Sequence, residues 1–145
     1  MMKHRLFITA LSLAAAALVT AGCGPGRPPG EQGGISEGMR FRITADSLPP
    51  RAMDRTLWRV TVTDAKTGAP IEGGEGRIWG RNKDGHYAGE GLEAAKELGT
   101  YLGTVEVMTA GSWQLHMEFR RNSNSPFGRI DWMQEVFAPR PLGGG

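Results

Sequence analysis

The sequence has little cysteine and little histidine. Its 145 residues include one cysteine and three histidines. A single cysteine excludes a disulfide within the chain. Only His86 and His116 follow the first 22 residues, so no histidine pair has the spacing of zinc ligands. These absences predict a protein that is not an enzyme.

An excess of charge of either sign is also missing. The chain has 17 Lys+Arg and 15 Asp+Glu. Lys3 and Arg5 lie in the first 22 residues, which contain no acidic residue, so the rest has 17 − 2 = 15 basic against 15 acidic residues. A nucleic-acid-binding protein needs a basic surface to neutralise phosphates. The balance therefore predicts no nucleic-acid partner.

Long apolar runs are absent except at the N-terminus. A short basic start is followed by an apolar run from Leu6 to Val19 and then by the small residues Thr20, Ala21 and Gly22. This order is typical of a secretory signal peptide, which we expect as a helix over residues 1–22. The run is shorter than the roughly 20 residues that a membrane-spanning helix requires.

Cys23 follows this segment directly. The stretch Val-Thr-Ala-Gly-Cys resembles the lipobox of bacterial lipoproteins, although that family prefers Leu where Thr20 stands. The resemblance implies cleavage before Cys23 and diacylglycerol on its thiol, which would make the lipid bilayer a partner. If the source is Gram-negative, a glycine at position 24, directly after the cysteine, resembles the sorting signal for the outer membrane. The alternative is an ordinary signal peptide with an incidental cysteine. We expect a protein of the cell envelope, lipid-anchored on the periplasmic or outer face.

Three segments follow the predicted signal peptide. Residues 23–38 are the lipidated cysteine and a Gly/Pro-rich stretch, predicted to be a flexible tether. Residues 39–138 are the predicted domain. Residues 139–145 are expected to be a disordered tail.

Hydrophobic side chains alternate within the domain. In "LWRVTVTD" and "SWQLHMEFR" every second residue is apolar, which indicates strands buried on one face. Similar patterns occur in "MRFRITA", "EGRIWG", "TYLGTVEVM" and "RIDWMQEVFA", where Trp132 and Met133 compete for the core. Residues 84–99 break the pattern, and we expect two helical turns or a mobile connection there. The fold class is all-β, an immunoglobulin-like antiparallel sandwich of six or seven strands.

One part of the domain is similar to a known group. The stretch "GTYLGTVEVMTAGSWQLHMEF" resembles the signature of YtkA-like and FixH-like domains, through Gly99, Tyr101, Met108, Gly111, Trp113 and Leu115. The resemblance implies an exported or membrane-attached β-sandwich without known catalytic residues. FixH-like proteins are associated with the assembly of copper-containing respiratory oxidases. Several relatives have Met- and His-rich segments at the place where this chain has only His86. This difference from the relatives argues against copper handling.

Two kinds of site are candidates. Copper(I) prefers thioether and imidazole ligands, and the candidate ligands are His86, Met108 and His116. Ordinary solvated histidines are the favoured interpretation, so no cofactor is expected and copper is the alternative. The candidates for a partner surface are Trp79, Tyr87 and Trp132. For Trp79 and Trp132, however, the favoured interpretation is that they are half-buried edges of the core.

The sequence predicts a non-catalytic interaction or accessory module with an unknown envelope protein as partner. The alternative is a copper-handling assembly factor.

Overall fold

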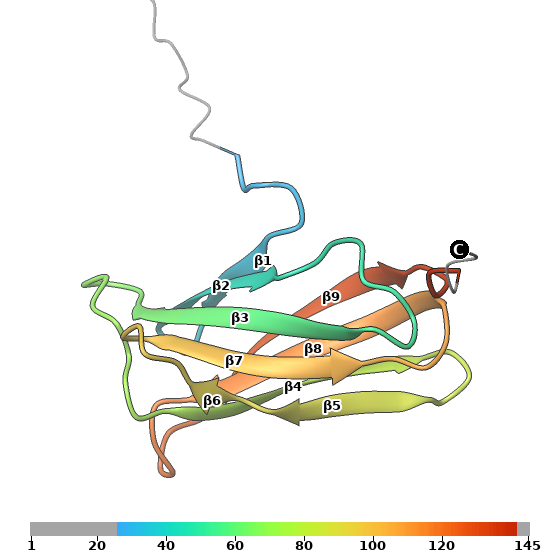
Figure 1. Ribbon diagram of the computed structural model, residues 1–145. Helices are drawn as coiled ribbons and strands as arrows, with labels where there is room; N and C mark the ends of the chain where they lie inside the picture. Colours follow the sequence, from blue (N-terminus) through green and yellow to red (C-terminus); the bar gives the residue numbers. More distant parts are fainter. Residues whose placement is uncertain (1–25, 142–145) are drawn as a thin grey trace, which may run out of the picture.

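The computed structural model describes residues 26–141, which form two antiparallel sheets packed face to face (Figure 1). The predicted signal helix and Cys23 lie outside the described residues. In spatial order, the first sheet contains β1 (Gln32–Ser36), β2 (Met39–Ala45), β3 (Arg55–Asp64), β7 (Thr100–Glu106) and β6 (Glu93–Ala94). The second contains β5 (Tyr87–Gly91), β4 (Glu75–Asn82), β8 (Gly111–Arg120) and β9 (Gly128–Val136). The predicted all-β sandwich is confirmed.

The core lies between the two sheets and follows the alternation in the sequence. Trp58 of β3 and Trp113 of β8 are almost completely buried, and Trp58 packs on Trp132 of β9 with ring centroids 5.4 Å apart. Burial of a large apolar side chain stabilises the fold by about 1.5–3 kcal/mol. The inward faces predicted for these segments are confirmed for Met39, Phe41, Ile43, Trp58, Val60, Val62, Tyr101, Val105, Val107, Trp113, Leu115, Met117 and Phe119.

The ambiguity in the last strand is resolved in favour of tryptophan. Trp132 points into the core and is 8% exposed, whereas Met133 is 64% exposed on the opposite face. Trp132 therefore lies in the core, in line with the favoured interpretation rather than with a partner surface. An indole buries far more apolar area than a thioether chain, so the register that puts Trp132 inside is favoured.

The helix considered for residues 84–99 does not form. The segment contains β5 and β6 instead, and the N–H of Leu92 donates to Gly76 O at 2.8 Å. Gly85, Gly89 and Gly91 weaken a helix there, and an isolated helix of two turns is unstable in water. Pairing with β4 and then with β7 satisfies the backbone groups that face those strands. Among residues 26–141 there is no helix, and hence none long and apolar enough to cross a membrane.

Part of the segment predicted to be a tether is ordered, because its residues 32–36 form strand β1. Gln32 pairs with Ile43, and Ser36 pairs with Met39, along an antiparallel ladder with β2. Gly33 has a φ of 152°, a conformation that suits glycine. Because the segment is rich in glycine, its sequence does not indicate a strand. The strand depends on its pairing with β2. The ordered domain starts 39 − 32 = 7 residues earlier than the sequence predicts.

Candidate functional site

The outer face of the second sheet, which points away from the core, has an unusual row of side chains. Gly89 of β5 stands opposite Trp79 of β4, Trp79 opposite His116 of β8, and His116 opposite Asp131 of β9. Outward positions of such a sheet normally carry solvated polar residues. Trp79 and His116, however, are only 8% and 9% exposed. This row is the first part of the candidate site.

Trp79 and His116 bury each other. Their rings stack with centroids 5.0 Å apart and an angle of 24° between the planes. A Cβ on Gly89 would lie 2.4 Å from the Cβ of Trp79, so glycine is required for strand β5 to lie this close. His116 therefore lies on the outer face as predicted, but it is enclosed rather than solvated.

Asp131 orients the imidazole of His116. Nδ1 of His116 lies 2.6 Å from Oδ1 of Asp131, a distance typical of a charge-assisted hydrogen bond. The other ring nitrogen, Nε2, is buried and has no hydrogen-bond partner among residues 26–141. A buried polar atom without a partner costs free energy, so this atom marks the site as unusual.

Two arginines hold Glu118 in the neighbouring row. Nε of Arg77 donates to Oε1 of Glu118 at 2.6 Å, and Nη2 of Arg129 donates to Oε2 at 3.0 Å. Burial raises the pKa of Glu118, but the hydrogen bonds from Arg129 and Arg77 outweigh it and lower the pKa below its ordinary value. The carboxyl group is therefore held as an anion.

The same arginines cover the indole of Trp79. The guanidinium carbon of Arg77 lies 4.5 Å from the ring centroid, and that of Arg129 lies 5.5 Å from it. Cations over an indole face are attracted by its quadrupole. Trp79, His116, Asp131, Arg77, Glu118 and Arg129 thus form one interlocked cluster, which we call the Trp79 cluster.

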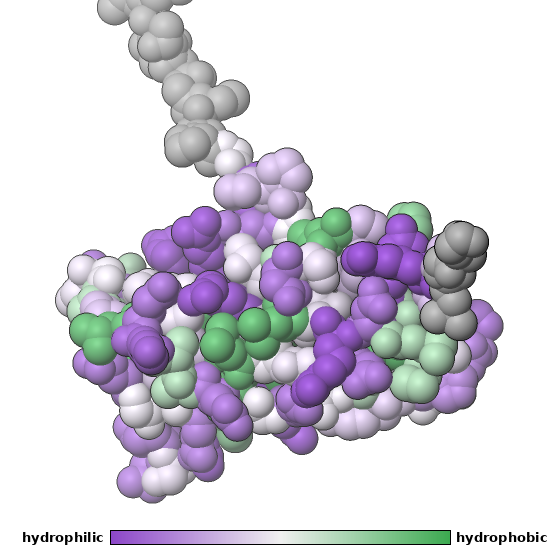
Figure 2. Space-filling view, viewed as in Figure 1, coloured by the Kyte–Doolittle hydropathy of each residue, from purple (hydrophilic) through white to green (hydrophobic). Residues whose placement is uncertain are grey.

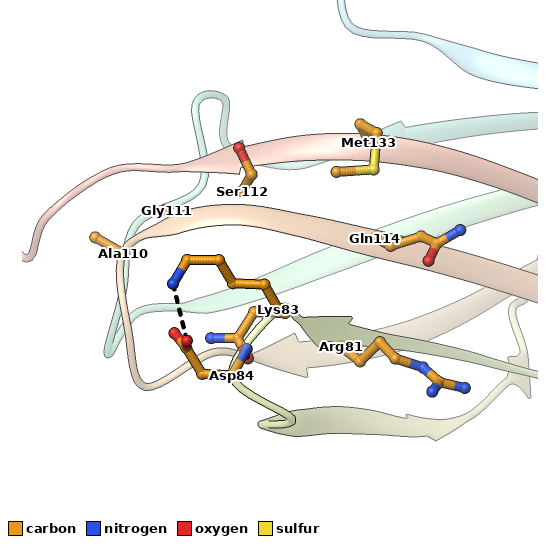
Figure 3. A pocket seen from close by; sticks show the side chains of 9 residues that line it. Arg81, Lys83, Asp84, Ala110, Gly111, Ser112, Gln114 and Met133 are labelled. Atoms are coloured by element: carbon orange, nitrogen blue, oxygen red, sulfur yellow. Dashed lines mark hydrogen bonds and ion pairs between the residues drawn. The ribbon is translucent and has the colours of Figure 1, made fainter.

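The next row of the same face is open to solvent. Tyr87, Arg81, Gln114 and Met133 stand opposite one another across the four strands. Tyr87 is 62% exposed and Met133 is 64% exposed. Beside them lies a hollow of about 470 Å³, whose lining includes Arg81, Gln114 and Met133. Figure 3 shows this hollow with the Lys83–Asp84 ion pair, 2.9 Å long, at its side.

The outer face of the first sheet is different. Figure 2 shows polar residues interspersed with limited apolar areas on the side where β3 and β7 lie in Figure 1. Arg59 of β3 pairs there with Glu97 at 3.1 Å, and both side chains are exposed to solvent. Exposed ion pairs of this kind contribute little to stability or binding. This face is an ordinary solvated surface.

The three candidate metal ligands are not brought together. Asn82 bonds to His86 at 3.1 Å and to Thr109, the neighbour of Met108, at 3.4 Å, so His86 and Met108 lie in loops at one end of the sheet. Asn82 pairs with Trp113, three residues from His116 along β8, which is about 10 Å in a strand. Within residues 26–141, no three His, Cys, Asp or Glu side chains are grouped as a metal site.

The sequence predicts some of the residues on this outer face. Tyr87 was a candidate for a partner surface and is exposed, while Trp79 is enclosed in the Trp79 cluster. Arg77, Glu118, Arg129 and Asp131 were missed. Their signal is the alternation of charge between neighbouring strands, which is visible only once the strand register is known.

The chain was compared with known proteins. No family model matches it, and no curated protein matches it. A solved structure of a DUF4426 family protein from Pseudomonas aeruginosa PAO1 is similar, with a TM-score of 0.59 and 13% identity over 77% of this chain and 98% of that chain. A copper-bound variant of FetP from uropathogenic Escherichia coli strain F11 has a TM-score of 0.49 and 10% identity, over 79% and 94% of the two chains. At such identities the first likeness shows the fold alone, a β-sandwich, and the second carries no argument.

Proposed function

We propose that this protein is a lipid-anchored, non-catalytic interaction or accessory module of the cell envelope, related to the YtkA-like and FixH-like sandwiches. The signal-like segment and Cys23 support the anchor, and the compact sandwich that begins at Gln32 supports the module. Two acyl chains hold a protein on a membrane where one chain does not. The module would present one face of the sandwich to an envelope protein.

The observation that carries the proposal is the row Tyr87, Arg81, Gln114 and Met133. Tyrosine, arginine and methionine are enriched in protein interfaces, and tyrosine and arginine often dominate the binding energy. Here they stand exposed side by side on strands rather than on loops. The Trp79 cluster packs in the adjoining rows and fixes the strands beneath them. A rigid surface loses less conformational entropy on binding, so this row is suited to hold a partner.

The state of the carboxylates supports a role in binding rather than in catalysis. A general acid at neutral pH needs a raised pKa. The pKa of Glu118 is lowered instead, because Arg129 and Arg77 outweigh the effect of its burial. Asp131 is engaged by His116 at 2.6 Å. Glu118 therefore acts as a structural anion in the Trp79 cluster, and Asp131 acts as the hydrogen-bond partner of His116.

The proposal is tested by photo-crosslinking of the full-length chain in its native envelope. A photoreactive amino acid at Tyr87 should give one defined adduct, and the same amino acid at Leu98, which is 63% exposed elsewhere, is the matched control. Arg81→Ala and Met133→Ala should each weaken the Tyr87 adduct. Equal adducts at Tyr87 and Leu98, or an adduct insensitive to both substitutions, would contradict the proposal.

A second candidate function, copper handling, is favoured by one observation. Asp131 fixes Nδ1 of His116 and leaves Nε2 without a partner among the described residues. Metal-ligating histidines commonly have one ring nitrogen held by a carboxylate in this way. Titration of the full-length chain with copper(I) tests it. Binding tighter than micromolar that is lost in His116→Ala but kept in His86→Ala supports it, and weaker binding removes it.

A further inference from the structure

Strand β5 is an open edge of the sandwich. It pairs with β4 on one side only, and it lies at the border of the ribbon in Figure 1. The N–H of Leu92 donates to Gly76 O and the N–H of Asn82 donates to His86 O, so the even-numbered residues here bond to β4. In an antiparallel ladder the alternate residues point the other way. The N–H and C=O groups of Tyr87, Gly89 and Gly91 therefore point outward, and among residues 26–141 no backbone partner meets them.

The edges of the first sheet are less available. β6 has only two residues, a common way to blunt an edge. Strand β1 is packed against β9, where the hydroxyl of Ser36 accepts a hydrogen bond from the N–H of Arg129 at 3.1 Å. Strand β6 is too short for a ladder, and at β1 the guanidinium of Arg27 donates to Gly33 O at 3.0 Å, which occupies part of that edge.

Strand β9 is the other edge of the second sheet, and its ends are occupied. Ser36 bonds to Arg129 at one end, and Phe137 exchanges hydrogen bonds with Pro50 and Ala52 just beyond the other. A symmetric antiparallel pair centred on Met133 would also place Asp131 directly opposite Glu135 of a second copy. Like charges in that position are destabilising. This edge disfavours pairing with itself.

Strand β5, unlike β9, has an edge that favours pairing with a second copy of itself. Its sequence Tyr-Ala-Gly-Glu-Gly contains no proline and no lysine, the residues that commonly guard an edge. The glycines leave the outer surface of the strand bare beside the exposed ring of Tyr87. Glu90 points to the other face, where it lies 3.9 Å from Arg55.

We propose that a second copy of this chain pairs antiparallel along β5. In the symmetric register centred on Gly89, Tyr87 stands opposite the partner's Gly91, and the partner's Tyr87 stands opposite Gly91. An aromatic ring over a cross-strand glycine compensates the missing side chain. Glu90 faces the partner's Ala88, so no like charges are opposed. The three outward residues of each copy satisfy one another's backbone groups.

The pairing extends the proposed function without depending on it. A two-fold axis perpendicular to the sheet keeps both outer faces on the same side. The two copies would then form one eight-stranded sheet with a continuous outer face. This face would carry two rows of Tyr87, Arg81, Gln114 and Met133 and would offer a larger surface than one copy alone.

Cysteine pairs test the register. In full-length protein carrying Cys23→Ser, we expect Tyr87→Cys together with Gly91→Cys to give a disulfide-linked dimer under mild oxidation. Opposite residues of a hydrogen-bonded pair have Cα atoms about 5.5 Å apart, within the range of a disulfide. Each single variant should stay unlinked, because identical positions of the two copies are then about 14 Å apart along the strands. No linked dimer in the double variant, or equal linking in a single variant, would overturn the proposal.

Sedimentation velocity of the full-length chain in detergent gives a second measurement. Gly91→Pro removes an outward N–H at a position where a Cβ has room, since its nearest neighbour is 3.9 Å away. We expect this variant to weaken dimerisation by about tenfold or more. Met133→Pro, at an outward position on β9, is the control and should leave dimerisation unchanged. A wild-type chain that stays monomeric, or an equal effect of both substitutions, would refute pairing along β5.

Discussion

The indole of Trp79 stacks on the imidazole of His116 on the outer face of the second sheet, with 5.0 Å between the ring centroids. This contact makes a second, smaller buried layer outside the main core. The layer is closed by Arg77 and Arg129, which cover the indole and share Glu118. It gives strands β4, β8 and β9 a fixed relation beneath the exposed row that contains Tyr87.

Trp79→Ala should lower the free energy of unfolding by about 2–4 kcal/mol, because it uncovers His116 and removes the surface under both arginines. Tyr87→Ala, which removes an exposed ring on the same face, should change it by less than about 0.5 kcal/mol. Urea denaturation of both variants measures the difference. Similar effects of the two substitutions would show that the Trp79 cluster does not stabilise the sheet.

Trp113→Ala should cost about 3–5 kcal/mol, as is usual for a tryptophan lost from a core. Trp113 is 1% exposed, and its Nε1 donates to Thr109 O at 3.0 Å. The melting temperature should therefore fall steeply. A melting temperature near that of the wild type would mean that the inward face of β8 is assigned incorrectly.

Gly89→Ala should lower stability by about 1–3 kcal/mol, because its Cβ would lie 2.4 Å from the Cβ of Trp79 and 2.6 Å from Ile78 O. Gly91→Ala is the matched control, since its Cβ meets nothing closer than Gly76 O at 3.9 Å. Thermal unfolding of the two variants compares a crowded with an open glycine on one strand. Equal losses would contradict the close approach of β5 to Trp79.

Acid should destabilise the protein partly through Glu118. Its pKa is lower in the folded than in the unfolded chain, since the hydrogen bonds from Arg129 and Arg77 outweigh burial. The stabilisation is therefore present above the ordinary glutamate value of 4.5 and is lost as the pH falls through the folded pKa. Glu118→Gln should reduce the loss of stability on acidification, measured by denaturation across this pH range. Glu72→Gln, an exposed site outside the Trp79 cluster, is the control, and an equal effect there would contradict the assignment.

Much of the fold could be predicted because alternation with period two reports burial directly. The segments around Trp58 and Trp113 satisfy it along their whole length, and both were placed correctly. The turn after β3 is formed by neighbouring residues: Asp64 accepts hydrogen bonds at 2.9 Å from the N–H groups of Lys66 and Thr67, and Gly68 has a φ of 75°. These features depend on local sequence.

What could not be predicted depends on pairing between distant strands. Strand β1 is rich in glycine and is ordered by β2, and residues 87–94 switch from one sheet to the other at Leu92. The burial of His116 depends on Trp79, which lies 116 − 79 = 37 residues away in the sequence. The period of the hydrophobic pattern within one strand does not indicate which distant residues lie beside that strand.

Membrane association is the central claim, and mass spectrometry of the mature protein from its native envelope tests it most directly. The account predicts a chain that begins at Cys23 and has diacylglycerol on its sulfur, and it predicts that Cys23→Ser releases a folded domain from membranes. An unmodified thiol at Cys23, or a chain that is not cleaved before it, would contradict the account.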